Sequence, residues 1–111
     1  MLDHSPQLNQ VFHALADPTR RAMVERLTRG AASVSQLAAP FPVSLSAIGQ
    51  HVQLLESSGL VRTVKKGRVR QVELQPAALA AAEDWFAAHR AMWERRLDRL
   101  AVLLDEDEDE T

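Results

Sequence analysis

The sequence contains no cysteine and few aromatic residues. Without cysteine, the chain cannot form disulfides, thiolate metal sites or a thiol redox sensor. No stretch approaches the roughly 20 apolar residues of a membrane span, and the N-terminal segment MLDHSPQLNQ lacks the basic and apolar regions of a signal peptide. These absences predict a soluble, cytoplasmic protein, and 111 residues suit a single domain with a modest core.

Negative charge is concentrated at the C-terminus. The formal net charge is -2, yet the segment DEDEDE at residues 105–110 supplies six of the 15 acidic residues. Residues 1–104 therefore carry 13 basic and nine acidic residues, a net charge of +4. We expect one folded, mildly basic domain over residues 1–104 and a disordered acidic tail over residues 105–111, because a block of like charges cannot be buried.

Two helices are predicted near the N-terminus from apolar spacing and from their end signals. The first spans residues 7–16, and its apolar face holds Leu8, Val11 and Phe12. The second begins at Asp17, which can act as N-cap before Pro18, and it stops at Gly30.

A helix-turn-helix is predicted between residues 33 and 59. The segment SVSQLAAPFPVS holds a short helix that ends before Pro40, and Ser44 can cap the next helix, which Gly59 terminates. Two helices joined by a tight turn form this motif.

The second helix of that motif has an outer face of small and amide side chains, where a solvated helix would carry Lys and Glu. A helix in the DNA major groove needs such side chains, since Gln pairs with adenine edges and Ser with several bases. The predicted DNA contacts on this helix are Ser44, Ser46, Ala47, Gln50 and Gln53.

Two neighbouring positions in this helix allow alternatives. Leu45 either meets a thymine methyl group or covers the turn, and the sequence favours neither. Glycine at position 49 lowers helix stability by about 1 kcal/mol relative to Ala. We therefore expect that a neighbouring group occupies the space that a side chain would fill. We favour a neighbouring helix packed close to it over the DNA backbone.

A β-hairpin follows, because the segment LVRTVKKGRVRQVEL alternates on two short runs that flank Lys66 and Gly67. A hairpin directly after a helix-turn-helix is a wing. Its tip carries four cations that would contact phosphate without selecting a sequence. These residues are Lys65, Lys66, Arg68 and Arg70.

A long helix is expected from Pro76 to Leu104, with one apolar stripe that includes Trp93. The stripe is too long for so small a domain to cover alone, which predicts a two-fold dimer. Trp85, Phe86 and Trp93 could line a pocket for an unidentified small-molecule effector at the dimer interface, although aromatic residues at helical spacing are more often core. The expected fold class is mainly α with a small β-hairpin wing.

Four segments together resemble the ArsR family of winged-helix transcriptional regulators, in particular its cysteine-free branch: FHALADPTRRAMVERL, VSQLAAPFPVSLSAIGQHVQLLESSGLV, KKGRVRQVEL and WERRLDRLAVLL. The resemblance covers residues 8–104. It implies a winged helix-turn-helix that is a homodimeric repressor of an inverted-repeat operator, often in its own promoter. It also implies a dimer interface made by helices 7–16 and 77–104, with Leu8, Val11, Phe12, Phe86, Trp93, Leu97 and Leu100 as the interface residues.

The resemblance also bears on the recognition helix. Family members often carry histidine at the position of His51, which implies a packing role or a phosphate contact there. They commonly have basic residues where this chain has Gln50 and Gln53, so this helix offers fewer phosphate anchors than usual.

We expect no metal, no other cofactor and no enzymatic activity. The segment SQLAAPF offers no metal ligand, and Asp84, His89 and Glu94 lie about 140° apart around a helix, so they share no face. No nucleophile stands at a recognised spacing from a base, and no glycine-rich phosphate loop is present. A winged-helix module for protein interaction is the main alternative, which the cationic tip disfavours.

Overall fold

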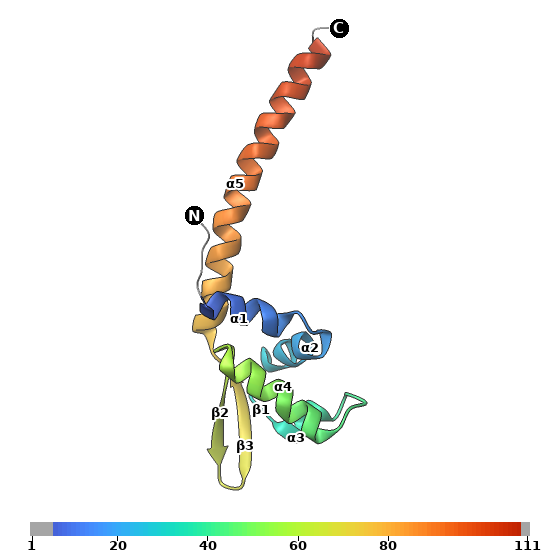
Figure 1. The fold of residues 1–111 in the computed structure, drawn as a ribbon, viewed down its shortest axis with the longest axis vertical. Coiled ribbons are helices and arrows are strands. Elements are labelled where there is room, and N and C mark those ends of the chain that lie inside the picture. Colours follow the sequence, from blue (N-terminus) through green and yellow to red (C-terminus); the bar gives the residue numbers. More distant parts are fainter. Residues whose placement is uncertain (1–5, 110–111) are drawn as a thin grey trace. The chain divides into compact units, whose positions relative to one another are not determined.

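The computed structural model describes residues 6–109, and it consists of helices and one small antiparallel sheet (Figure 1). Contacts divide the chain into two compact units whose boundary falls between Ala81 and Ala82. The elements in chain order are α1 (Pro6–Leu15), α2 (Pro18–Leu27), β1 (Ala32–Ser33), α3 (Val34–Ala38), α4 (Leu45–Ser57), β2 (Val61–Lys66), β3 (Val69–Leu74) and α5 (Pro76–Asp109). The predicted mainly α fold with a small β wing is confirmed.

The first unit is built around a core to which every one of its elements contributes a buried side chain. Helices α3 and α4 pack together as the predicted helix-turn-helix, and the sheet closes the core beside them (Figure 1). The largest fully buried apolar side chains are Val11, Met23, Leu37, Ile48, Leu55, Leu60, Val61 and Val72.

Local capping fixes the ends of the helices in this unit. The backbone N–H of Arg20 donates to the Asp17 carboxylate at the start of α2, over 3.0 Å. At the end of α4, Gly59 has a φ of +84°, and the N–H of Leu60 donates back to the Leu55 carbonyl. Glycine is suited to this left-handed position because it has no Cβ.

The sheet has three strands in the order β1-β3-β2, one more than the sequence predicts. The additional strand β1 pairs antiparallel with β3 through Ala32 opposite Val72. Two residues are too few to show alternation, so the pattern of apolar residues could not reveal this strand. Its pairing attaches the start of α3 to the wing.

The hairpin turn lies one residue later than the flanking pattern suggests. Lys66 pairs with Val69, so Gly67 and Arg68 form the two-residue loop. Gly67 has a φ of +65°, and no other residue type has a positive φ in the described chain. Gly at the first loop position with a negative φ after it matches a type II′ turn, which places Arg68 at the tip.

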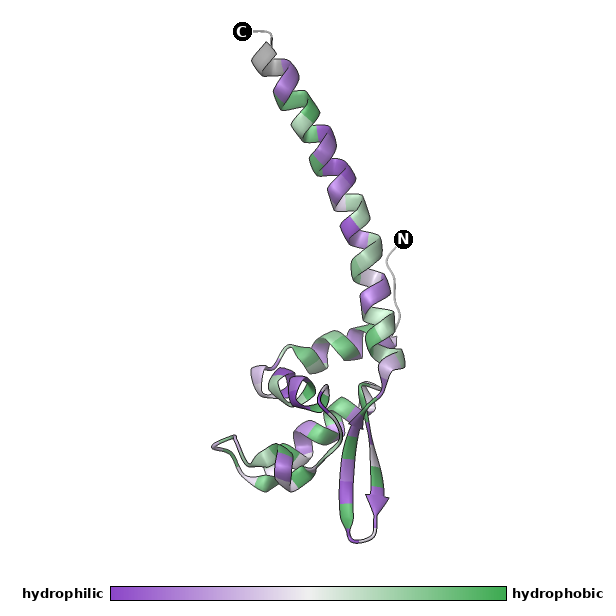
Figure 2. Ribbon diagram, turned by 180° about the vertical axis from the view of Figure 1, so that it is seen from behind, coloured by the Kyte–Doolittle hydropathy of each residue, from purple (hydrophilic) through white to green (hydrophobic). Residues whose placement is uncertain are grey.

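Helix α5 supplies the second unit, and it carries apolar residues along much of its length (Figure 2). The large apolar side chains exposed on it are Phe86, Trp93, Leu97, Leu100, Val102, Leu103 and Leu104. The helix continues to Asp109 instead of ending at the expected Leu104, because no Gly or Pro follows to stop it. Residues 105–109 of the expected disordered tail are therefore helical, whereas residues 110 and 111 lie outside the described chain.

Candidate nucleic-acid interface

Helix α4 presents the predicted polar face to solvent. Ile48, Val52 and Leu55 are buried, so the opposite side of the helix is free of the core. On that side the amide side chains of Gln50 and Gln53 are exposed. Ser46 is exposed too, and Ala47 is half-buried.

The residues at the start of α4 differ in how available their side chains are for contact with a ligand. The Ser44 hydroxyl oxygen accepts the Ala47 N–H over 3.0 Å as the N-cap, so its acceptor capacity is partly used within the helix. Leu45, whose role the sequence left open, is 56% exposed. An exposed leucine at the start of this helix remains available for apolar contact with a thymine methyl group.

Gly49 faces open space. A Cβ built at this position would meet nothing within 4 Å in the described chain. The hypothesis that a neighbouring helix needs this space is therefore wrong, because no other helix of the described chain comes within 4 Å of that Cβ. Gly49 instead lines the groove between α4 and the wing.

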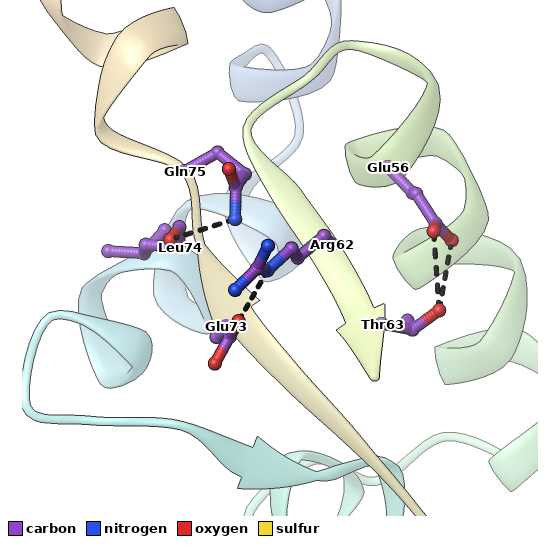
Figure 3. Close-up of polar contacts among 6 residues, drawn as sticks. All are labelled: Glu56, Arg62, Thr63, Glu73, Leu74 and Gln75. Atoms are coloured by element: carbon purple, nitrogen blue, oxygen red, sulfur yellow. Dashed lines mark hydrogen bonds and ion pairs between the residues drawn. The ribbon is translucent and has the colours of Figure 1, made fainter. Parts of the chain in front are cut away.

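Two cations on the wing face one another across the hairpin, and within the described residues no ion pair joins either of them to a carboxylate. Lys65 pairs directly with Arg70 across the hairpin, and like charges in such a pair repel. By contrast, Arg62 forms an ion pair with Glu73, its own cross-strand partner (Figure 3). The wing therefore holds two like charges near its tip, which an anion would stabilise.

Helix α4 and the wing enclose a common groove of about 860 Å³. Of the predicted contacts, Ser46, Gln50 and Gln53 line it from α4, and Arg68 and Arg70 line it from the hairpin. The groove brings amide and hydroxyl side chains of α4 and cations of the hairpin to one surface. The other predicted contacts, Ser44, Ala47, His51, Lys65 and Lys66, do not line it.

Residues at the start of α3 also line this groove, a contribution that the sequence prediction missed. Ser33, Val34 and Ser35 reach it because β1 pairs with β3. The one sequence signal in this segment was the capping box: the Ser33 hydroxyl accepts the Gln36 N–H, and the Gln36 side chain accepts the Ser33 N–H. The capping box predicts where α3 begins, but it does not predict that this segment lies beside the hairpin.

One carboxylate lies in the same groove. Glu56 accepts a hydrogen bond from the Thr63 hydroxyl over 3.2 Å, which ties the end of α4 to β2 (Figure 3). Its negative charge opposes that of Arg68 and Arg70. Glu56 therefore has a structural role in orienting the wing, and it lowers the positive potential of the groove.

The predicted dimer-interface residues fall into two groups. Phe86, Trp93, Leu97 and Leu100 are each more than half exposed on α5, so they are not core of the single chain. On α1, Leu8 and Phe12 are half-buried. Val11 is fully buried, so it has no surface to offer a partner and its assignment to the interface is corrected.

The described residues show neither a metal centre nor a membrane span. They contain no group of three side chains suited to hold a metal ion. Within the same part of the chain, no helix is long and apolar enough to cross a membrane. His89 stacks on Trp85 with ring centroids 4.0 Å apart and bonds to the Trp85 carbonyl, so it is engaged within α5.

A helix-turn-helix followed by a basic hairpin defines a winged helix-turn-helix protein, and comparisons agree with this class. A helix-turn-helix domain family matches residues 15–64. The HTH-type transcriptional regulator Rv2034 of Mycobacterium tuberculosis is 40% identical, covering 93% of this chain and 94% of its own. The chain therefore belongs to the ArsR family of DNA-binding transcriptional regulators, which is not an enzyme family.

Two further relatives extend the comparison. The crystal structure of the ArsR family transcriptional regulator RHA00566 has a TM-score of 0.77 and 47% identity, over 85% of this chain and 97% of that one. The transcriptional repressor SdpR of Bacillus subtilis is 28% identical over 70% of this chain and 87% of its own length.

Proposed function

We propose that this protein is a cytoplasmic homodimeric repressor that binds an inverted-repeat operator, including one in its own promoter. The observation that carries this proposal is the shared groove, in which the amide face of α4 meets Arg68 and Arg70 of the wing. This arrangement joins a surface able to select bases with a surface able to hold phosphate.

Each side of the groove has its own role in the proposal. Gln50, Gln53 and Ser46 contact base edges in the major groove and supply the discrimination between sequences. Arg68, Arg70 and the lysines of the hairpin contact phosphate and supply affinity that depends on salt. The repulsion between Lys65 and Arg70 is relieved when DNA phosphate lies beside them.

A second copy of the chain accounts for the exposed stripe on α5. Trp93 is 57% exposed, and Leu97 and Leu100 continue its face. Isolated chains rarely leave so much contiguous apolar surface in water, and a two-fold partner would bury it. In such a dimer the two α4 helices would meet half-sites about 34 Å apart on one face of the DNA.

Fluorescence anisotropy over a salt series tests the assignment, with the protein's own upstream region and random DNA as probes. Gln50→Ala and Ser46→Ala should reduce discrimination, because each base contact is worth about 1–3 kcal/mol. Arg68→Ala should weaken binding to both probes and lower the salt slope by about one phosphate contact.

Arg62→Ala is the matched control for the wing, since Arg62 already pairs with Glu73 and should change the salt slope least. Altered base preference in Arg68→Ala, with no effect of Gln50→Ala, would reverse the two roles. Equal affinity for all DNA probes in every variant would instead favour a protein-interaction module.

A further inference from the structure

Arg20 connects three helices of the first unit through one guanidinium group. Its Nε donates to the Ala14 carbonyl over 2.7 Å, and its Nη2 donates to the His13 carbonyl over 3.3 Å. These carbonyls lie in the last turn of α1, and the His13 carbonyl also accepts the backbone N–H of Ala16 over 3.2 Å. Its Nη1 lies 3.2 Å from Nδ1 of His51 on α4.

The chemistry of the two groups bears on the tautomer of the histidine. A guanidinium group donates at every N–H and has no acceptor, so Nδ1 of His51 must accept. An accepting Nδ1 leaves Nε2 as the ring nitrogen that carries a proton. When Nδ1 accepts from Arg20, the His51 ring has one N–H donor, at Nε2. No described residue accepts a hydrogen bond from this N–H.

We propose that Arg20 is a positioning residue that holds His51 in its Nε2–H tautomer, and that this N–H donates to a DNA phosphate at the flank of α4. The inference rests on the proposed function of α4 as the recognition helix. It explains why His51, a predicted contact, does not line the groove with Gln50. Its ring lies on the side of α4 that faces α2, outside the base-reading face, and a phosphate oxygen needs only one donor.

Through Arg20, the end of α1 is connected to His51 on the recognition helix α4. The proposed dimer uses Leu8 and Phe12 of α1, and the end of α1 is held by the side chain that orients His51. A shift of α1 relative to α2 would therefore move the Arg20 guanidinium and release the His51 ring.

Arg21 offers a matched control because it occupies the adjacent position with a similar role. Its Nη1 donates to the Leu15 carbonyl over 2.7 Å, so it also satisfies the end of α1, but it makes no contact with His51. Arg21→Met removes a cap alone, whereas Arg20→Met removes a cap and the link to α4.

Nitrogen NMR of the imidazole rings tests the tautomer in the free protein. We expect the proton of His51 on Nε2 in the wild type and in Arg21→Met, and a mixture of tautomers in Arg20→Met. Thermal unfolding of all three variants controls for loss of fold. A wild-type ring protonated on Nδ1, or a ring that is unchanged in Arg20→Met, would overturn the positioning role.

Two substitutions of His51 test the donor in DNA binding. His51→Asn keeps an acceptor near the position of Nδ1 and removes the outer donor, and it should weaken binding to operator and random DNA by about tenfold, as expected for a hydrogen bond to a charged group. His51→Gln places an amide N–H near the position of Nε2 and should restore most of the affinity. The salt slope should stay unchanged in both, because the donor is neutral.

The outcomes separate this inference from the proposed function. Loss of discrimination in Gln50→Ala, with full affinity in His51→Asn, would reject the phosphate contact and leave the recognition helix in place. A salt slope lowered by about one in His51→Asn would show a charged histidine and contradict the tautomer. No effect of any α4 variant would reject the proposed function itself.

Discussion

Gly49 is a residue at which we expect fold stability and DNA binding to impose opposite demands. Because a Cβ there meets nothing within 4 Å, Gly49→Ala should stabilise the free protein by about 1 kcal/mol, through helix propensity alone. The same methyl group enters the groove that DNA is proposed to occupy, so operator affinity should fall. Thermal denaturation and anisotropy measure the two effects on one variant.

Opposite signs in these two measurements would assign the glycine to close approach of DNA. An equal or higher operator affinity in Gly49→Ala would show that the groove has room for a side chain, and the glycine would then have no role in binding.

Asp17 makes stability depend on pH at the start of α2. The hydrogen bond from the Arg20 backbone N–H, aided by the nearby positive charge of Arg20, lowers the pKa of Asp17 below its ordinary value of 3.8, although partial desolvation opposes this shift. A carboxyl group with a lowered folded pKa stabilises the fold above its unfolded pKa, and that contribution is lost as pH falls through the folded value.

Asp17→Ala should therefore lower Tm by a few degrees at neutral pH, and the difference from wild type should shrink below about pH 3.8, the ordinary value. Asp17→Asn is the control, because asparagine also caps helices but does not titrate. A difference between Asp17→Ala and wild type that persists unchanged at acid pH would show that the carboxylate charge is not involved.

At the scale of elements, Glu56 links α4 to β2 and places a negative charge in the groove. Glu56→Gln keeps an acceptor for the Thr63 hydroxyl and removes that charge. Affinity for random DNA should rise by up to about fivefold at low salt, since unit charges about 4 Å apart in water interact by about 1 kcal/mol. The gain should fade at high salt.

Thr63→Val provides the complementary variant, because it removes the hydrogen bond and leaves the carboxylate. If it raised affinity as Glu56→Gln does, orientation of the wing would explain the result, and charge would not.

The helices of the first unit were predictable because their ends carry strong local signals. Asp17 with Pro18, Ser44 and Gly59 each mark a boundary within a residue or two of the observed one. Strand β1 was not predictable, since its two residues form a strand only through pairing with β3. Sequence alone likewise could not show that Gly49 faces open space or that Arg20 reaches His51, because both depend on tertiary placement.

The sequence predicted most of the residues of the candidate site, but it did not predict all of their positions. The amide face of α4 follows from helical periodicity, since burial of Ile48 and Val52 leaves Gln50 outside. The unbalanced pair Lys65 and Arg70 requires the strand register, which a one-residue error in the turn changes.

At the scale of the whole molecule, dimerisation and DNA binding are coupled in the proposal. Trp93→Ala combined with Leu97→Ala should weaken self-association by more than about tenfold, because large apolar side chains at the centre of an interface dominate its free energy. Sedimentation equilibrium measures the association. Val102→Ala is a control, since Val102 is an exposed apolar residue on another side of α5.

The double variant should also lose operator affinity while keeping its helical content. A monomer that binds operator as tightly as the wild type would separate dimerisation from DNA recognition and contradict this coupling.

Footprinting of the wild-type protein on its own upstream region tests the central claim most directly. The proposed dimer predicts two protected segments related by two-fold sequence symmetry, with centres about 34 Å apart on the same face of the DNA. A single protected segment without symmetry, or protection no stronger than on random DNA, would contradict the proposal that this protein is a homodimeric regulator of an inverted-repeat operator.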